Sequence, residues 1–403
     1  MITRIKNIKN IATWSVNENS IVFFPKKEIQ ISDGKIMKID NSISDYDMEI
    51  DAQNLFVTPG FIDSHTHPIY IGNRAHEFSL RSQGLNYEDI IADGGGIVSS
   101  IDALRNASED ELFNHCYKKI ESFLKYGTTT IEAKSGYGLS FDDEVKSLKV
   151  IKKINEKSKI DLIPTFLGAH DFPKEYNNKD EYVDLICNKM IPFISENQLA
   201  EYCDVFCEDG FFTLEQTRKI INCANDYGIK GRLHADELKY SSSAELAAEL
   251  GVASADHLME ASDIGIKKMA ENNVVATILP GTTLFLGKTK YANGRKMIDM
   301  GCDVSLASDY NPGTCTIQSL PFIMFLGMTY CGLTLDETFK AVTYSSSKAL
   351  NIENNVGRIK ENYFADLLFW DIDSINEIPY WMGNEKLKKV MKKGELVVEN
   401  NIN

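Results

Sequence analysis

The stretch Val57-Thr58-Pro59-Gly60-Phe61-Ile62-Asp63-Ser64-His65-Thr66-His67 places two histidines, two residues apart, at the end of an apolar run. Phe61 and Ile62 follow a Pro-Gly break and are typical of a short buried strand. Because residues i and i+2 of a strand point to the same face, we expect His65 and His67 to face the same way. Two neutral imidazoles so placed can bind Zn or Fe. The alternative is a pair of hydrogen-bonded histidines at a strand end.

Beyond Thr58 the chain alternates between apolar strands and amphipathic helices. The strand at 61–62 is followed by predicted strands at 128–134, 160–167, 203–207, 229–234, 252–257, 274–279 and 303–307. A first helix opens at the S-x-x-E capping box of Ser108 to Glu111 and stops at Gly127. Further helices are predicted at 142–156, 181–195, 213–226, 242–250, 262–272, 288–300, 317–331 and 335–350. Eight strands alternating with helices predict a parallel (β/α)8 TIM barrel, which we assign to residues 58–354.

The two ends of the chain have strand patterning of another kind. Two apolar-alternating runs between residues 29 and 39 are joined at Asp33-Gly34, a hairpin signal. Residues 365–370 and 390–398 return to strand patterning near the C-terminus. Such short segments are not stable alone, so residues 1–57 and 355–403 are predicted to join into one small β-sandwich domain beside the barrel. A Gly-rich loop at 81–100 is long enough to be a lid or a binding loop.

Composition narrows the classes of function. The 403 residues are 43% hydrophobic and 25% charged, which is globular, and the formal net charge is -15. That charge argues against a nucleic acid partner and against an anionic membrane surface. The longest apolar stretch, around 322–333, is shorter than the ~20 residues that a membrane span needs. Eight scattered cysteines without C-x-x-C pairs indicate free thiols, and we expect a soluble cytoplasmic protein.

Polar residues gather at the predicted strand ends, where a barrel of this kind has its active site. They are His65, His67, Lys134, Tyr137, His170, His234, Glu237, His257 and Asp309. Each has an ordinary explanation: a single strand-end histidine is often a hydrogen-bonding core residue, Asp309 precedes a Pro-Gly turn, and Glu237 could start a helix. Their convergence on one rim favours a shared site. His76 and His115 fall in a predicted loop and a predicted helix, and we give them no role.

The motifs in order resemble the amidohydrolase superfamily and, within it, the imidazolonepropionase family of histidine degradation. The matching segments are 61–67 (F-I-D-S-H-T-H), 72–74 (G-N-R), 134–138 (K-S-G-Y-G), 167–170 (L-G-A-H), 233–237 (L-H-A-D-E), 254–257 (S-A-D-H) and 308–314 (S-D-Y-N-P-G-T). The resemblance extends to the split β domain and to the segment 356–366. One departure lies there: Asn362 stands where Gly is common, which affects a turn rather than the chemistry.

The resemblance implies one Zn or Fe ion held by His65, His67, His234 and Asp309. Three neutral imidazoles and one carboxylate leave a divalent ion with net positive charge and with room for a water whose pKa falls toward neutrality. Relatives with two metals carry a bridging carboxylated lysine in strand 4. The absence of a lysine in the predicted strand 203–207 therefore favours a single ion.

The implied reaction is hydrolysis of the cyclic amide of 4-imidazolone-5-propanoate, a small anion, to N-formimidoyl-L-glutamate. Glu237 is expected to move the proton from the attacking water to the ring nitrogen, with Asp309 as the competing general base. His170 and His257 would stabilise the oxyanion or orient the water. Arg74 is the expected clamp for the propionate, the alternative being a solvated loop arginine. Family substrate contacts map onto Tyr137, His170, Glu237, Asn311, Gly313 and Thr314; Lys134 is left unassigned.

Two other functions stay open at this point. A metal-dependent deaminase of a nucleobase-like ring would share the ligand pattern, although a neutral base gives no reason for a carboxylate clamp at Arg74. A non-catalytic scaffold of the same fold is the other alternative, but such proteins typically lose metal ligands, and all four are present here. The sequence leaves open the identity of the metal, a homodimer and the motion of the loop at 81–100.

Overall fold

The centre of the molecule is a parallel sheet of eight strands that follow one another in chain order. The computed structural model describes residues 1–85, 95–382 and 385–400. The strands are β8 (Phe61–Asp63), β9 (Thr128–Lys134), β10 (Asp161–Ala169), β11 (Tyr202–Cys207), β12 (Lys230–Ala235), β13 (Ser254–His257), β14 (Val275–Ile278) and β15 (Val304–Leu306). Each overlaps its predicted range, and the prediction of a (β/α)8 barrel is confirmed.

The barrel closes between its first and last strands, just beyond their C-terminal ends. The backbone N–H of Asp309 donates to the carbonyl oxygen of His65 at 3.1 Å, and the N–H of His67 donates to that of Tyr310 at 2.8 Å. Thr66 and Tyr310 form a parallel bridge at the same place. The seam that closes the barrel is therefore also the place where two predicted ligand segments meet.

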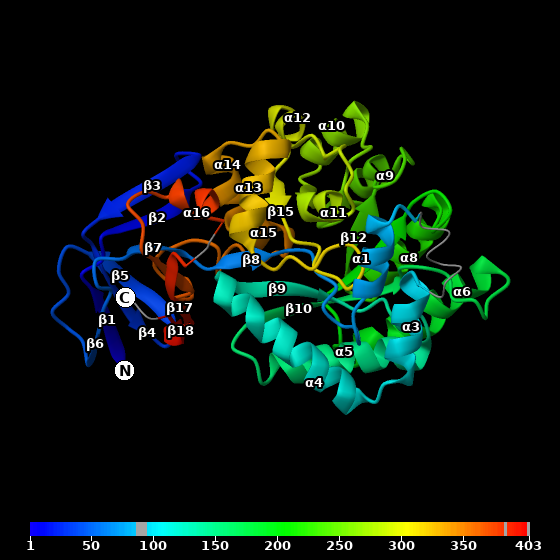
Figure 1. Cartoon of the computed structure of the whole chain (residues 1–403), viewed down its shortest axis with the longest axis horizontal. Helices are drawn as coiled ribbons and strands as arrows, with labels where there is room; N and C mark the ends of the chain where they lie inside the picture. The colour runs from blue at the N-terminus through cyan, green and yellow to red at the C-terminus, as the bar shows by residue number, and fades with distance from the viewer. Residues whose placement is uncertain (86–94, 383–384, 401–403) are drawn as a thin grey trace.

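Helices cover the outside of the sheet (Figure 1). They are α1 (Ala75–Ser82), α3 (Ile97–Asn106), α4 (Glu109–Glu121), α5 (Phe141–Asn155), α6 (Lys179–Leu185), α7 (Ile191–Glu196), α8 (Leu214–Asp226), α9 (Ser243–Leu250), α10 (Asp263–Glu271), α11 (Pro280–Phe285), α12 (Gly294–Asp299), α13 (Leu320–Tyr330), α14 (Leu335–Ala341), α15 (Tyr344–Ala349) and α16 (Glu377–Tyr380). The capping box predicted at Ser108 and Glu111 opens α4. A 3-10 turn (Ser122–Tyr126) follows and ends at Gly127, whose φ of 87° only glycine adopts freely.

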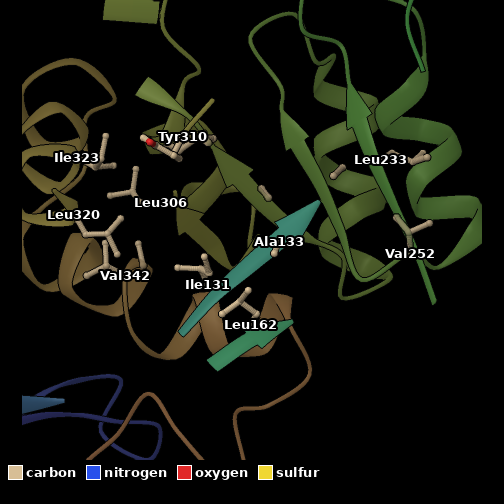
Figure 2. Close-up of a cluster of buried hydrophobic side chains, with 14 of the residues drawn as sticks. Ile131, Ala133, Leu162, Leu233, Val252, Leu306, Tyr310, Leu320, Ile323 and Val342 are labelled. Atoms are coloured by element: carbon tan, nitrogen blue, oxygen red, sulfur yellow. The ribbon is translucent and has the colours of Figure 1, made fainter. Parts of the chain in front are cut away.

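Strand alternation divides the barrel into two environments. In β9, Ile131 and Ala133 belong to the large apolar core, whereas Glu132 and Lys134 contact charged residues of β12 and β11. Figure 2 shows part of the apolar core, where Leu162 of β10 and Leu306 of β15 are among the buried side chains. Successive residues of a strand face opposite sides, so apolar packing against the helices leaves the alternate positions free to be polar. The polar face holds the candidate site.

Two further sheets come from the two ends of the chain. One has the order β5-β4-β1-β6 and the other β18-β17-β16-β7-β2-β3. Their strands are β1 (Ile2–Lys6), β2 (Asn10–Ser15), β3 (Ser20–Pro25), β4 (Glu28–Ser32), β5 (Lys35–Asp40), β6 (Met48–Asp51), β7 (Phe56–Pro59), β16 (Leu367–Trp370), β17 (Leu387–Lys392) and β18 (Glu395–Glu399). Figure 1 shows the blue N-terminal strands beside the red C-terminal strands at one end of the molecule.

The two sheets share a buried core and so form the predicted β-sandwich. Ile5 and Ile29 of the first sheet cluster with Val57 and Phe369 of the second. The predicted hairpin joins β4 to β5, and Asp33 and Gly34 have φ of 51° and 75°, as the tight hairpin turn requires. Asn362 also has a positive φ, 71°, which explains why glycine suits that position. The division of the chain at residues 57/58 and 354/355 stays a prediction.

Some helix predictions differ from the structure. The predicted helix at 288–300 begins at Gly294, and α11 was not predicted because its short segment continues the apolar run of β14. The predicted helix at 335–350 is two helices, because Thr343 leaves helical geometry with φ -127° and ψ -88°. Residues 86–94 of the predicted loop at 81–100 lie outside the described residues. The predicted loop begins within the last residues of α1 and ends within the first residues of α3. Among the described helices, none is long and apolar enough to span a bilayer.

Candidate metal centre and active site

Four predicted ligands converge at the C-terminal ends of three strands. Nε2 of His67 lies 3.1 Å from Nε2 of His65 and 3.4 Å from Nε2 of His234. Oδ1 of Asp309 lies 3.6 Å from Nε2 of His65 and 3.4 Å from Nε2 of His67. All four side chains are nearly or fully buried. Residues separated by up to 244 positions in the chain, from 65 to 309, thus present their donor atoms to one point.

The spacing of these atoms fits a metal ion. Four ligands at the ~2.0–2.1 Å typical of Zn–N and Zn–O bonds stand about 3.3 Å apart in a tetrahedron. The separations among His65, His67 and Asp309, and that between His67 and His234, are 3.1 to 3.6 Å and bracket that value. Thr282 donates its hydroxyl hydrogen to Oδ2 of Asp309, which leaves Oδ1 for the ion. Asp309 has φ 54°, an uncommon backbone conformation that turns the carboxylate toward the histidines.

Buried carboxylates hold the far sides of two ligand imidazoles. Nδ1 of His65 lies 2.7 Å from Oδ2 of Asp256, and Nδ1 of His234 lies 3.0 Å from Oδ2 of Asp204. A carboxylate at Nδ1 keeps the proton there, so Nε2 is left with its lone pair on the side of the other predicted ligands. Asp204 and Asp256 were not predicted as site residues. The available signal was a carboxylate inside an apolar strand, which is rare unless it is paired.

These two aspartates belong to a fully buried charge network beneath the metal centre. Nζ of Lys134 donates to Oδ2 of Asp204 at 2.6 Å and to Oε1 of Glu132 at 2.7 Å. Nη2 of Arg232 lies 3.3 Å from Oδ2 of Asp256, and its Nε lies 3.2 Å from Oε1 of Glu132. Burial opposes the charge on Lys134, but Asp204 and Glu132 outweigh it and raise its pKa. Lys134, left unassigned from sequence, is therefore a charged structural partner of the ligand supports.

Glu237 stands at the wall of the cavity next to the ligands. Burial raises the pKa of its carboxyl group to about 7. Its Oε2 lies 3.5 Å from Nε2 of His257. The buried carboxylate of Glu208 fixes the backbone here, since it accepts hydrogen bonds from the N–H groups of Glu237, Leu238 and Lys239 at 2.8, 3.1 and 3.1 Å. The carboxyl group of Glu237 therefore has a pKa near neutral pH, and hydrogen bonds to Glu208 hold its backbone in place.

His170 has a defined tautomer. Its Nδ1 lies 2.8 Å from the carbonyl oxygen of Gly136, which can only accept, so Nδ1 carries the proton. Burial lowers the pKa of His170 to about 4, so the ring is neutral and its Nε2 is an acceptor. The ring stacks on His67 with centroids 5.2 Å apart. Tyr137 packs edge-on against His170 at 5.5 Å.

A second buried carboxylate supports the loop of Tyr137. Glu144 accepts hydrogen bonds from the N–H groups of Gly136, Gly138 and Leu139 at 3.2, 2.8 and 2.9 Å. The arrangement parallels that of Glu208 under Glu237. The loops that present Glu237 and Tyr137 are therefore each held by three backbone hydrogen bonds to one buried carboxylate.

The ligands open into a cavity of about 390 Å³, a size suited to a small molecule. Of the predicted site residues, His67, Arg74, Tyr137, His170, His234, Glu237, His257, Asp309, Asn311 and Thr314 line it. Gly313 belongs to the adjoining loop, where the Asn311 side-chain oxygen accepts from the N–H groups of Gly313 and Thr314. Arg74 donates from Nε and Nη2 to Glu77 at 2.8 and 2.7 Å. His115 packs against Tyr70 instead.

Residues 56–397 match the model of the amidohydrolase family. The chain belongs to the amidohydrolase family. It is 42% identical over 372 residues to imidazolonepropionase of Alkaliphilus oremlandii, covering 92% of this chain and 88% of that protein. It is 40% identical over 408 residues to imidazolonepropionase of Clostridium tetani, covering 98% and 97%.

Solved structures agree with this amidohydrolase at the level of the fold. An adenosine deaminase from Xanthomonas campestris with bound zinc superposes with a TM-score of 0.76 at 14% identity, covering 98% of this chain and 93% of that one. A triazine hydrolase variant gives a TM-score of 0.75 at 16% identity, covering 99% and 95%. The family and the cluster of histidines and aspartate both fit a metal ion.

Sequence reasoning about this amidohydrolase missed several lining residues. Arg81, Lys288, Phe206 and Phe211 line the cavity but had no assigned role. Arg81 stands seven residues after Arg74 in a segment whose helix was not predicted. The helical spacing itself was the available signal, because residues seven apart on a helix share a face.

Proposed function

We propose that this amidohydrolase hydrolyses the ring amide of 4-imidazolone-5-propanoate to N-formimidoyl-L-glutamate in L-histidine degradation. One observation carries the proposal: the four donor atoms of His65, His67, His234 and Asp309 converge at a cavity that Arg74 also lines. The similarity to imidazolonepropionases over nearly the whole chain supports the choice of substrate. The cavity's size suits a five-membered ring with a short carboxylate chain.

The proposed cofactor is one Zn or Fe ion held by the four donors. When bound, such an ion lowers the pKa of a water and polarises a carbonyl group. The pairing of Lys134 supports a single ion, because its ammonium group is engaged by Glu132 and Asp204. Asp204, on strand β11, is in turn engaged by Lys134 and His234, so neither side chain is free to bridge a second ion.

Glu237 is the proposed proton carrier. Attack of water on the ring carbonyl carbon forms a C–O bond, the ring C–N bond breaks, and the carbonyl carbon becomes that of a carboxylate. Glu237 takes the proton that the water loses and delivers it to the departing ring nitrogen. Its pKa, raised by burial to about 7, suits both tasks near neutral pH. Asp309 is the weaker candidate, since Thr282 holds one oxygen and the metal would hold the other.

The two remaining histidines take different proposed roles. Because Nδ1 of His170 donates to Gly136, its Nε2 can accept a hydrogen bond from a ring N–H and so orient the substrate. This tautomer favours orientation over stabilisation of an oxyanion. His257 faces Glu237 and lies close to His65 and Asp309, and in the proposed reaction its N–H stabilises the developing negative charge.

The anchor for the propionate is Arg74. The two hydrogen bonds from Arg74 to Glu77 use the N–H of Nε and one N–H of Nη2. The edge formed by Nη1 and Nη2 is then left to bind a carboxylate. Gly313 allows the guanidinium group to occupy this position, because a Cβ there would lie 2.1 Å from Nη1 of Arg74. Arg74→Lys should raise KM with little change in kcat, since a lysine cannot offer the two-pronged contact.

The direct test is turnover by purified protein loaded with Zn or Fe. We expect loss of 4-imidazolone-5-propanoate and formation of N-formimidoyl-L-glutamate without release of ammonia. Elemental analysis should give about one ion per chain. Release of ammonia from nucleobase-like rings would instead indicate a deaminase. A fully metal-loaded protein with no turnover of either substrate would support the scaffold alternative.

A further inference from the structure

Arg81 is a cavity-lining cation that the mechanism above does not use. It lies in the last turn of α1, seven residues after Arg74, and so on the same helix face. Both side chains reach Gly313: Nη2 of Arg81 donates to its carbonyl oxygen at 3.2 Å, and Nη1 of Arg74 lies against its Cα hydrogens. Two guanidinium groups therefore meet at one residue of the cavity wall.

The charges of these two arginines are compensated differently. The two hydrogen bonds from Arg74 to Glu77 form a bidentate ion pair, with the Glu77 side chain buried. An anion that approaches the open edge of Arg74 also approaches the negative charge of Glu77. The pair as a whole is neutral, so it offers geometry for a carboxylate but little net attraction.

Arg81, by contrast, has no carboxylate within 4.0 Å among the residues that the structure describes. Its guanidinium group packs near the rings of Phe78 and Phe285, with its central carbon 5.9 and 5.7 Å from their centroids. Burial and the charge of Arg74 lower the pKa of Arg81, and the more distant charge of Glu77 offsets part of this effect. The carbonyl oxygen of Gly313 uses one of its five N–H donors. A half-buried guanidinium that lines a cavity and has no carboxylate partner within the described part of the chain is chemically suited to an anion.

We infer that Arg81 and Arg74 together form the subsite for the substrate's carboxylate, with Arg74 setting its orientation and Arg81 supplying its net positive charge. This inference rests on the proposed function for the identity of the substrate. It makes Arg81 a determinant of specificity: a ring with an anionic side chain is retained, and the same ring with a neutral side chain is not. Arg81 would contact the carboxylate and take no part in proton transfer.

Lys288 is the other cation without an assigned role in the cavity lining, and it serves as the matched control. It is exposed, and its positive charge acts on both Glu237 and His257. Lys288 therefore stands near the reacting end of the cavity, whereas Arg81 stands beside Gly313. Removing either charge changes the net charge of the cavity equally, so only position separates the two variants.

The test is calorimetric binding of two unreactive probes to the metal-loaded protein, imidazole-4-propanoate and the neutral 4-propylimidazole. We expect Arg81→Gln to raise the Kd of the propanoate about 10- to 100-fold, as for loss of a charged hydrogen bond, while the Kd of the neutral probe changes less than about twofold. Arg81→Lys should recover part of the loss, and Lys288→Gln should change the propanoate Kd less than about threefold. Thermal unfolding of each variant checks that the fold is intact.

Three results would overturn the inference. The first is an unchanged propanoate Kd in Arg81→Gln, the second is an equal loss for both probes, and the third is a loss in Lys288→Gln as large as that in Arg81→Gln. The experiment needs no turnover, so it is separable from the proposed function. If the protein fails to hydrolyse imidazolonepropanoate yet Arg81 still selects the anionic probe, the subsite stands and the proposed reaction falls.

Discussion

The ammonium nitrogen of Lys134 lies 2.6 Å from Oδ2 of Asp204, and both side chains are fully buried. The same aspartate oxygen lies 3.0 Å from Nδ1 of His234, whose Nε2 faces the metal centre. Lys134, which does not line the cavity, is thus connected to the proposed ion through two residues, Asp204 and His234. Removal of one member of such a set leaves uncompensated charge in the interior, which is costly.

Lys134→Met should destabilise the protein strongly. Loss of the ammonium group leaves Asp204 and Glu132 buried without their cation, at a cost of about 3–5 kcal/mol in the free energy of unfolding. Urea-induced unfolding at constant metal concentration measures the change. Lys159→Met is the control, because Lys159 pairs with Glu395 on the exposed surface, and its removal should cost less than about 1 kcal/mol. Equal effects of the two substitutions would contradict the role of the buried network.

Asp256→Asn should weaken metal binding. The substitution removes the charge that orients His65 at Nδ1, and loss of such a support typically costs about 10- to 100-fold in metal affinity. Competition with a chelator of known affinity gives the change. Asp303→Asn is the matched control, because Asp303 is paired with Lys340 and Lys348 away from the cavity. It should lower stability while the metal affinity stays within about threefold of the unsubstituted protein.

The pH dependence of kcat should reflect the ionisation of Glu237. Its carboxyl group acts as a base only when ionised, and burial raises its pKa to about 7, so kcat should fall as the pH drops through the pKa of this group. A bound cation stabilises the carboxylate, which places the limb of the metal-loaded enzyme below that value. Glu237→Gln should reduce kcat by about 10²-fold or more and abolish this limb, with metal content unchanged. If an active Glu237→Gln variant kept the same fall of kcat at low pH, the titrating group would be a residue other than Glu237.

Glu208 and Glu144 should produce contrasting kinetic defects. Each carboxylate accepts three backbone hydrogen bonds, Glu208 under Glu237 and Glu144 under the Tyr137 loop. Replacement by glutamine puts an NH2 group where acceptors are needed, and each such bond to a charged group contributes about 1.5–3 kcal/mol. Glu208→Gln should therefore lower kcat about tenfold or more, whereas Glu144→Gln should mainly raise KM. Steady-state kinetics of both variants decide the point, and identical defects in the two would show that neither acts through its loop.

Much of the architecture followed from local sequence patterns. The apolar runs and the helical periodicity predicted the eight parallel strands, because burial on one face and the 3.6-residue repeat are local properties. The positions of His65, His234 and Asp309 after such runs put them at one rim, since parallel strands joined by helices all end on the same side. The Asp33-Gly34 hairpin was equally local, since its turn geometry depends on two residues.

The tertiary structure alone decided which charges meet. Asp256 supports His65 across 191 residues of chain, and Lys134 finds Asp204 across 70, because the register of β9 to β13 sets these contacts. No local pattern records which buried carboxylate will neutralise which cation. Arg74 differs in this respect, because its partner Glu77 is only three residues away. The sequence by itself determined the barrel and the types of the predicted ligands. Closure of the barrel decided which buried charged residues hold those ligands in place, because a buried charge needs a partner and that partner can be distant in the chain.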